Sequence, residues 1–165
     1  MIALETRYGF PFTVRPATHD DEVALAAFFD EVSDEDRRFR FLSAVRHVSP
    51  AQLHDITAFE HHRHETVLAF EPGGATIIAA ATLAADKAGD IGEVAISILP
   101  ELKGKGIGWT LLDHMAQEAR HWGIKKLQSI ESRDNHAAIS LEREMGFTAR
   151  AVNGDPALML LERCF

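Results

Sequence analysis

The sequence predicts an α/β fold in which helices flank a mixed central β-sheet of about six to seven strands. Residues 65–86 contain two apolar runs joined by Pro-Gly-Gly, which is typical of an antiparallel hairpin. Residues 90–153 alternate strand-like and helix-like patterns, which is typical of β-α-β units with parallel neighbours. One sheet must therefore contain both parallel and antiparallel pairs.

The first part of the chain predicts one strand and two or three helices. Residues 12–18 alternate apolar and polar side chains around a proline, as a short strand does. A helix follows an acidic first turn and places apolar side chains at helical spacing, namely Val23, Leu25, Ala26 and Phe29. Shorter helical patterns cover 33–43 and 50–59. We expect four phenylalanines of these helices to line the core or a pocket: Phe29, Phe39, Phe41 and Phe59.

The rest of the chain predicts six strands and two helices. The helix from about 106 to 122 carries a continuous apolar stripe, so one of its faces should be buried. The expected elements are strands 65–71, 75–86 and 90–100, helix 106–122, strand 126–132, helix 135–145, and strands 147–153 and 157–163.

Length and composition bound the class of protein. The 165 residues predict a single domain, 1–165, with ordinary apolar and charged content. The first seventeen residues lack a basic region followed by an apolar run, so we expect no signal peptide. With no stretch long enough to span a membrane and only Cys164 as a thiol, we expect a cytoplasmic protein. A net charge of −8 disfavours nucleic-acid binding and suits a basic partner.

The segment 101–110, ELKGKGIGWT, is a glycine-rich loop between an expected strand and an expected helix. Unblocked backbone N–H groups at a helix N-terminus favour a phosphate. The spacing of Gly104, Gly106 and Gly108 excludes the dinucleotide fingerprint, and no Gly-Lys-Ser/Thr supplies a Walker loop. The remaining alternatives are another kind of phosphate loop or a turn without a ligand.

Two segments carry a family resemblance. Residues 103–108 resemble the Q/R-x-x-G-x-G/A signature of the GNAT acyl-CoA N-acyltransferases, and 135–147 resemble their N-x-x-A-x-x-L-Y-x-x-x-G-F segment. The resemblance implies the GNAT fold, acetyl-CoA as co-substrate and no metal. Two positions depart from the pattern: Lys103 stands for the usual Arg or Gln, and Glu142 for the usual Tyr. Because that Tyr often protonates the leaving thiolate, no general acid is assigned here.

The chain most resembles the acyltransferase domain of bacterial Pat-type protein lysine acetyltransferases, through segments 33–57 and 61–70. The resemblance implies a primary amine as acceptor, with a protein lysine first and a small amine or amino-acid derivative second. A non-catalytic CoA-binding sensor is the alternative from another class. Dimers are common in the family, so the oligomeric state stays open between monomer and homodimer.

Glu93 is the candidate general base, because an attacking amine must lose its proton. Period-two alternation places it on one strand face with two small side chains, Ala95 and Ser97. A strand glutamate facing solvent or pairing with an arginine is the structural alternative. In the family, the strand's free backbone groups bind pantetheine, the loop binds pyrophosphate and the asparagine contacts the cofactor. The resemblance therefore implies a cofactor site made of Ile96, Ser97, Ile98, Lys103, Gly104, Lys105, Gly106, Ile107, Gly108 and Asn135.

Some residues admit two interpretations. Asn135 is also a favoured N-cap for the helix that it begins. The arginines at 37, 38 and 40 either reach the 3′-phosphate of CoA or pair with the acids at 34–36. The histidine cluster at 61–64 lies on an expected extended segment, where neighbours point to opposite faces, so His61, His62 and His64 are not expected to bind a metal.

Overall fold

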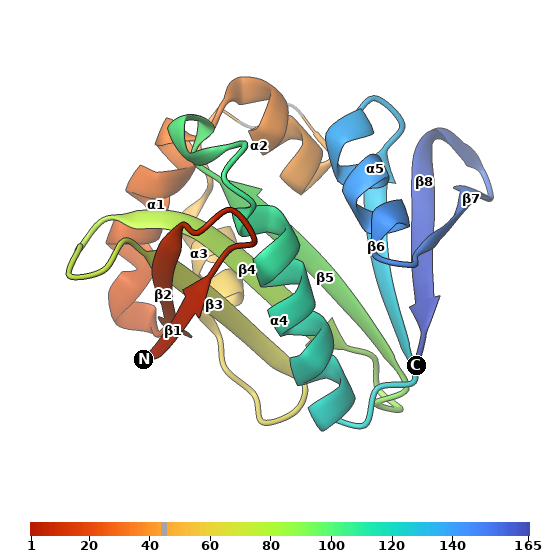
Figure 1. The fold of residues 1–165 in the computed structure, drawn as a ribbon. Coiled ribbons are helices and arrows are strands. Elements are labelled where there is room, and N and C mark those ends of the chain that lie inside the picture. The colour runs from red at the N-terminus through yellow and green to blue at the C-terminus, as the bar shows by residue number, and fades with distance from the viewer. Residues whose placement is uncertain (44–45) are drawn as a thin grey trace.

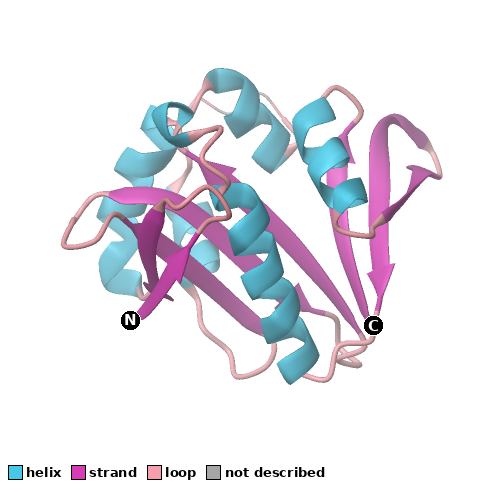
Figure 2. Ribbon diagram, in the orientation of Figure 1, coloured by secondary structure: helices cyan, strands magenta, loops and turns pink. Residues whose placement is uncertain are grey.

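The computed structural model describes residues 1–43 and 46–165; residues 44–45, inside the Pat-like segment 33–57, lie outside the described residues. Apart from an additional first strand, strands and helices follow the expected order (Figures 1 and 2). The strands are β1 (Ile2–Glu5), β2 (Pro11–Pro16), β3 (His64–Phe70), β4 (Ile77–Ala85), β5 (Ile91–Ile98), β6 (Lys126–Ser132), β7 (Thr148–Val152) and β8 (Asp155–Cys164). The helices are α1 (Glu22–Glu31), α2 (Asp34–Phe41), α3 (Pro50–Thr57), α4 (Ile107–His121) and α5 (His136–Glu144), with 3-10 turns η1 (His19–Asp21) and η2 (Pro100–Leu102).

The strands form one mixed sheet in the order β1-β2-β3-β4-β5-β6-β8-β7, which confirms the predicted fold class. The pair β5–β6 is parallel, and the other neighbouring pairs are antiparallel. The sheet has eight strands rather than six or seven because β1 adds to the edge of β2. This strand is four residues long and mostly exposed, so it shows no apolar alternation from which it could be predicted.

The central strand β4 is covered on both faces. Figure 1 shows α4 in front of the sheet and α1 and α3 behind it, and β4 contacts both α1 and α4. A strand covered on both sides must be apolar at every position of its centre. Ala79, Ala81 and Leu83 of β4 are fully buried, with Ile78 and Ala80 nearly so. No helix of the described residues is long and apolar enough to cross a membrane.

Caps fix the two short helices between β2 and β3. The Ser33 hydroxyl accepts a hydrogen bond from the Asp36 amide at 3.1 Å and begins α2. Ser49 and Gln52 form a reciprocal capping box at the start of α3, where Pro50 occupies the first turn. Because α2 contacts β5, its cap also fixes one wall of the site described below.

The predicted phenylalanine positions are correct for three of the four residues. Phe29 and Phe39 are buried, and Phe41 packs against the core. The prediction for Phe59 is wrong, because α3 ends at Thr57 and the ring is 62% exposed.

Candidate functional site

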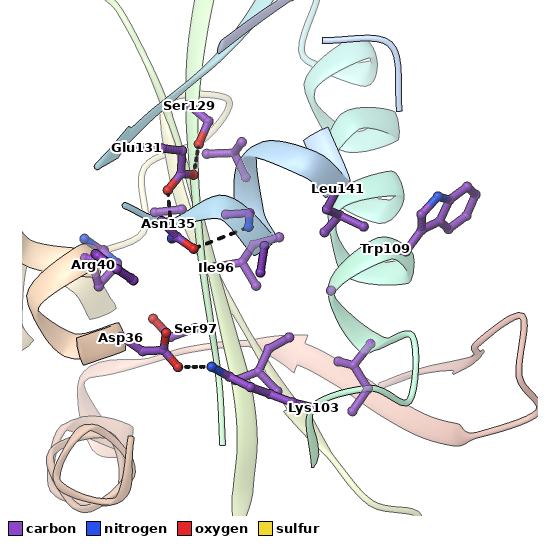
Figure 3. Close-up of a pocket in the computed structure, with 18 of the residues that line it drawn as sticks. Asp36, Arg40, Ile96, Ser97, Lys103, Trp109, Ser129, Glu131, Asn135 and Leu141 are labelled. Carbon is purple, nitrogen blue, oxygen red and sulfur yellow. Dashed lines mark hydrogen bonds and ion pairs between the residues drawn. The ribbon is translucent and has the colours of Figure 1, made fainter. Parts of the chain in front are cut away.

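A cavity of about 450 Å³ lies where β5 and β6 diverge (Figure 3). Parallel pairing between these strands extends only as far as Glu93 opposite Gln128. Side chains from α2, β5, the glycine loop, β6 and the start of α5 then enclose the space between them. The lining includes Asp36, Phe39, Arg40, Glu93, Ala95, Ile96, Ser97, Ile98, Lys103, Gly104, Gly106, Ile107, Gly108, Trp109, Ser129, Glu131, Asn135, Ala138 and Leu141.

One edge of β5 is open to this cavity. The strand pairs with β4 from Gly92 to Ile98, but with β6 only at Ile91, Gly92 and Glu93. Beyond Glu93, the peptide groups facing β6 have no strand partner among the described residues. Such an edge can hydrogen-bond an extended ligand that carries amide groups of its own. The predicted residues Ile96, Ser97 and Ile98 lie along it.

The glycine loop places the N-terminus of α4 at the same cavity. Gly104 and Gly106 adopt φ values of 79° and 89°, which side chains rarely tolerate, and Gly106 is the N-cap. A Cβ at Gly108 would lie 3.3 Å from Ile98 Cδ1, so glycine lets the helix start close to β5 without displacing that side chain. The first amides of α4, with their partial positive charge, suit a phosphate.

The two loop lysines differ in position. Lys103 lines the cavity and forms an ion pair with Asp36 of α2 (Figure 3). Lys105 does not line the cavity; its ammonium lies 5.5 Å from the ring centroid of Phe10. The loop therefore presents one lysine to the cavity, and that lysine already has an acidic partner.

Glu93 lies at the point where the two strands begin to separate, and its side chain is exposed in the cavity. The charge of Arg40 interacts with Glu93 and with Glu131 of β6. Burial lowers the pKa of Arg40, whereas these two carboxyl groups raise it. An arginine remains cationic under such opposing effects, so the centre of the cavity holds a positive charge between two acids.

The three arginines of α2 were expected either to reach the cofactor or to pair with the acids at 34–36, and each has different surroundings. Arg37 is buried, pairs with Asp34 and donates to the carbonyls of Phe29 and Val32 at 2.9 and 3.1 Å. Arg40 points into the cavity, and Arg38 is exposed. Sequence could not separate these outcomes, because they depend on where α2 lies against β5.

A second group of polar side chains lies on the β6 side of the cavity. Ser129 Oγ donates to Glu131 Oε1 at 2.6 Å, and Asn135 Nδ2 donates to Glu131 Oε2 at 3.3 Å (Figure 3). Asn135 also caps α5 by accepting from the Ala138 amide at 3.3 Å, which confirms the predicted cap. It lines the cavity, and its contact with the cofactor stays a prediction. Behind Glu131 lies Glu142, which is only 4% exposed.

The turn between β1 and β2 contributes residues that sequence reasoning missed. Arg7 and Tyr8 line the cavity, and the Arg7 guanidinium lies 5.3 Å from the Tyr8 ring and 5.5 Å from the Trp109 ring. Arg7 Nη1 also donates to Glu144 Oε1 at 2.8 Å, which joins this turn to α5. These residues lacked a sequence signal because β1 itself was not predicted.

The histidine cluster departs from the expected geometry. His61 and His62 do not point to opposite faces; their rings stack with centroids 3.9 Å apart. Residues 61–63 form a turn rather than a strand, and His62 adopts a φ of 55°, whereas His64 is the first residue of β3. His64 Nδ1 lies 2.6 Å from the Ala58 carbonyl, which closes the loop after α3.

Another cluster brings three possible metal ligands together at the surface: His19, Glu22 and His54. The rings of His19 and His54 are stacked within 4° of parallel, 4.1 Å apart. Metals bind imidazole nitrogens through lone pairs in the ring plane. Two parallel rings have lone pairs in parallel planes, which cannot converge on one ion, so this arrangement suits a stacked pair rather than a metal centre.

The comparisons with known proteins agree with this architecture. Residues 25–147 match the model of the acetyltransferase (GNAT) family. The chain is 26% identical over 139 residues to Acetyltransferase PA5475 of Pseudomonas aeruginosa, an alignment that covers 83% of this chain and 75% of that protein. It superposes on the GNAT domain of S. lividans PAT with a TM-score of 0.90 and 27% identity, covering 99% of this chain and 96% of that one.

A more distant structure shares the fold alone. The PaiA N-acetyltransferase of Thermoplasma acidophilum, solved in complex with coenzyme A, has a TM-score of 0.74 and 19% identity, covering 93% of this chain and 99% of that one. The matched family model spans α2, β5, the glycine loop, α4, β6 and α5, which supply most of the cavity lining. The chain belongs to the GNAT family of acetyltransferases.

Proposed function

We propose that this chain, acting as one domain over residues 1–165, transfers the acetyl group of acetyl-CoA to a primary amine, with a protein lysine as acceptor. The unpaired edge of β5 carries the proposal. It runs from Glu93 to the glycine loop, so one strand supplies a carboxylate, free peptide groups and the approach to a helix N-terminus inside one cavity. The relative from T. acidophilum, which was solved with coenzyme A, supports CoA as the carrier.

The cavity offers a separate contact for each part of the cofactor. The peptide groups of residues 96–98 would bind the pantetheine arm as an added strand would. The first-turn amides of α4, at Ile107 and Gly108, would bind the pyrophosphate. Lys103 would add a cation, and Asn135 would face the arm from α5. Lys105 acts at longer range, since it lies outside the cavity.

The reaction needs a base, because only a neutral amine attacks a thioester. A lysine with an ordinary pKa near 10.4 is neutral in only about one molecule in a few thousand at pH 7. Glu93 would remove the proton of the ammonium, directly or through one water. The amide of Ile96, which lies at the open edge of β5, would polarise the thioester carbonyl as an oxyanion donor.

The choice of acceptor rests on similarity and charge. The chain superposes on the GNAT domain of S. lividans PAT over nearly its whole length, and segments 33–57 and 61–70 resemble Pat-type lysine acetyltransferases. The net charge of −8 favours a basic partner surface over an acidic one. A small amine would fit the same chemistry, so the experiment below includes both kinds of acceptor.

Calorimetric titration with acetyl-CoA, combined with a thiol-release assay, tests the proposal. The acceptors are lysine peptides and a panel of small amines. We expect Glu93→Gln to bind acetyl-CoA as the native protein does and to lose about 10²–10⁴-fold in kcat, the usual contribution of a general base. The control is Glu71→Gln, because Glu71 is an exposed glutamate outside the cavity lining.

The possible results separate the alternatives. Absence of acetyl-CoA binding would refute the cofactor site. Binding without thiol release from any acceptor would support a sensor instead of an enzyme. Release with small amines but not with peptides would overturn the lysine assignment. Full activity in Glu93→Gln would remove Glu93 from the mechanism.

A further inference from the structure

The β6 side of the cavity holds two carboxyl groups that face one another. Glu131 of β6 lines the cavity, and Glu142 of α5 lies behind it, 4% exposed. The two carboxyl groups lie close enough for each to change the pKa of the other. Within the part of the chain that the structure describes, Glu142 Oε2 is buried and has no hydrogen-bond partner. Two carboxylates in contact inside a protein repel one another, so such a pair retains a proton between them.

The surroundings determine which of the two groups is protonated. Glu131 accepts hydrogen bonds from Ser129 and Asn135, and Arg40 of α2 stabilises its charge; these contacts oppose the effect of burial, which raises its pKa. Burial, followed by the negative charge of Glu131, raises the pKa of Glu142 to about 9. The proton therefore belongs to Glu142 at neutral pH.

The other charges near the pair come from across the cavity. Arg40 faces Glu131 and also Glu93 of β5, so one guanidinium lies between the proposed base and the acid pair. The remaining neighbours of the pair, Ser129 and Asn135, are neutral donors. Glu131 therefore faces the cavity beside two neutral donors and one cation, with a protonated acid directly behind it.

Acyl transfer requires a proton for the leaving group. When the amine nitrogen bonds to the acyl carbon and the carbon–sulfur bond breaks, the electron pair remains on the sulfur of the leaving group. A thiol has an ordinary pKa near 8.5, so a thiolate must gain a proton to leave as a neutral thiol near pH 7. A donor with a similar pKa transfers a proton most effectively.

We propose that Glu131 is the catalytic acid of this enzyme and that Glu142 is the proton store behind it. As the C–S bond breaks, the proton of Glu142 passes to Glu131, and Glu131 delivers a proton to the sulfur. The products are the acetylated amine and the free thiol. The proton lost by the amine leaves through Glu93, and solvent restores one proton to the pair. This inference rests on the proposed acetyltransferase function of the same cavity.

The other acidic groups at the cavity are less suited to this role. Among the described lining residues, Asp36 is engaged by Lys103, and Glu93 is exposed at the strand divergence. The phenol of Tyr8 belongs to a side chain that is 66% exposed on the β1–β2 turn. The Glu131–Glu142 pair alone among these combines contact with the cavity and a buried, retained proton.

The test compares pH profiles of kcat for the native enzyme, Glu131→Gln and Glu142→Gln. We expect kcat of the native enzyme to decline at alkaline pH as the pair loses its proton. In Glu131→Gln, kcat should fall about 10²-fold or more and the alkaline decline should disappear, while CoA affinity holds. In Glu142→Gln, the alkaline decline should move to lower pH, because Glu131 no longer has a carboxyl neighbour to supply a proton.

The matched control is Glu65→Gln. Glu65 of β3 is also half-buried with a raised pKa, caused by burial and by Glu118, but it lies outside the cavity lining. Its pH profile should match that of the native enzyme. Variants of Glu131 and Glu142 whose alkaline decline coincides with the native one would overturn the proposal, even if their kcat were lower, because a structural role alone lowers kcat at every pH.

A measurement without turnover separates this proposal from the function on which it rests. Infrared difference spectra recorded on either side of pH 9 should show the C=O band of a protonated carboxyl group, and Glu142→Gln should lack that band. Absence of the band in the native protein would refute the proton store. A band in a protein that transfers no acetyl group would instead refute the proposed function.

Discussion

Glu142 shows how a single side chain departs from what the family resemblance implies. The motif 135–147 places a tyrosine there in many members, and this chain places a glutamate that is 4% exposed. Burying a carboxyl group is unfavourable unless it keeps its proton. The contact with Glu131 makes ionisation still less favourable. This residue therefore makes folding stability depend on pH.

Replacing Glu142 by Gln should flatten that dependence. The pKa of Glu142 is about 9 in the folded protein and near 4.5 when unfolded. Below the lower value both states hold the proton; between the two values only the folded state holds it, so native stability falls as pH rises, by up to about 1.4 kcal/mol per pH unit. The Gln variant should be more stable than the native protein at pH 8, by urea denaturation. If the free energy of unfolding had the same slope between about pH 5 and pH 9 in the Gln variant and in the native protein, this prediction would be contradicted.

Asp36 illustrates a competing contact at the residue scale. Its carboxylate pairs with Lys103, the cation expected to meet the pyrophosphate. Asp36→Asn should release Lys103 and strengthen acetyl-CoA binding by roughly two- to fivefold. The gain is small because a partly exposed ion pair contributes little free energy. Calorimetric titration at low and high salt measures this, and the gain should shrink as salt rises.

The control for this change is Asp34→Asn. Asp34 also lies in the first turn of α2, but it is 97% exposed at its side chain and pairs with Arg37. Its replacement alters the same helix without touching Lys103. Equal effects of the two variants on affinity would attribute the change to α2 and not to the lysine.

At the scale of elements, the start of α4 depends on backbone conformation. Gly106 combines a φ of 89° with a tight neighbourhood, since a Cβ would lie 3.1 Å from both Thr6 Cβ and Tyr8 Cδ2. Gly106→Ala should lower the free energy of unfolding by about 1–3 kcal/mol and weaken acetyl-CoA binding. Urea denaturation and calorimetric titration would measure the two effects.

The opposite end of the same helix supplies the matched control. Gly123 has a φ of 83° with open space around it. Gly123→Ala should therefore destabilise the fold by backbone strain alone, about 1–2 kcal/mol, and leave cofactor affinity unchanged. If Gly106→Ala retained native affinity, the loop would have no direct part in phosphate binding.

At the scale of the whole molecule, the cavity separates two parts of one sheet. The β5–β6 pairing is short, and the Arg7–Glu144 ion pair crosses between the β1–β2 turn and α5. A ligand in the cavity would contact both parts at once. Binding to the folded state alone then stabilises the whole fold.

Acetyl-CoA should accordingly raise the melting temperature. At 100 times its dissociation constant, a ligand adds about 2.7 kcal/mol to stability. For a domain of this size, that corresponds to an increase of roughly 5–10 °C in a thermal denaturation scan. Adenosine alone should produce a smaller shift, because it lacks the groups proposed to bind along β5. Equal shifts would contradict a cofactor that extends along the strand.

The sequence by itself determined most of the elements and the composition of the site. Apolar periodicity identified α4 and α5, and Pro-Gly-Gly identified the β3–β4 hairpin, because these signals depend on neighbours along the chain. The glycine spacing identified the loop at 103–108 for the same reason. Local patterns were less informative for Val23, which fits the helical stripe of α1 and yet is 84% exposed.

Only the tertiary structure decided how these parts meet. The divergence of β5 from β6, the contact of Asp36 with Lys103, and the burial of Glu142 against Glu131 join residues far apart in the sequence. The short exposed strand β1, with Arg7 and Tyr8 after it, is likewise a feature that only the tertiary structure decided. Side-chain charge and burial depend on packing across elements, and a single sequence records the residues of such contacts but not their pairing.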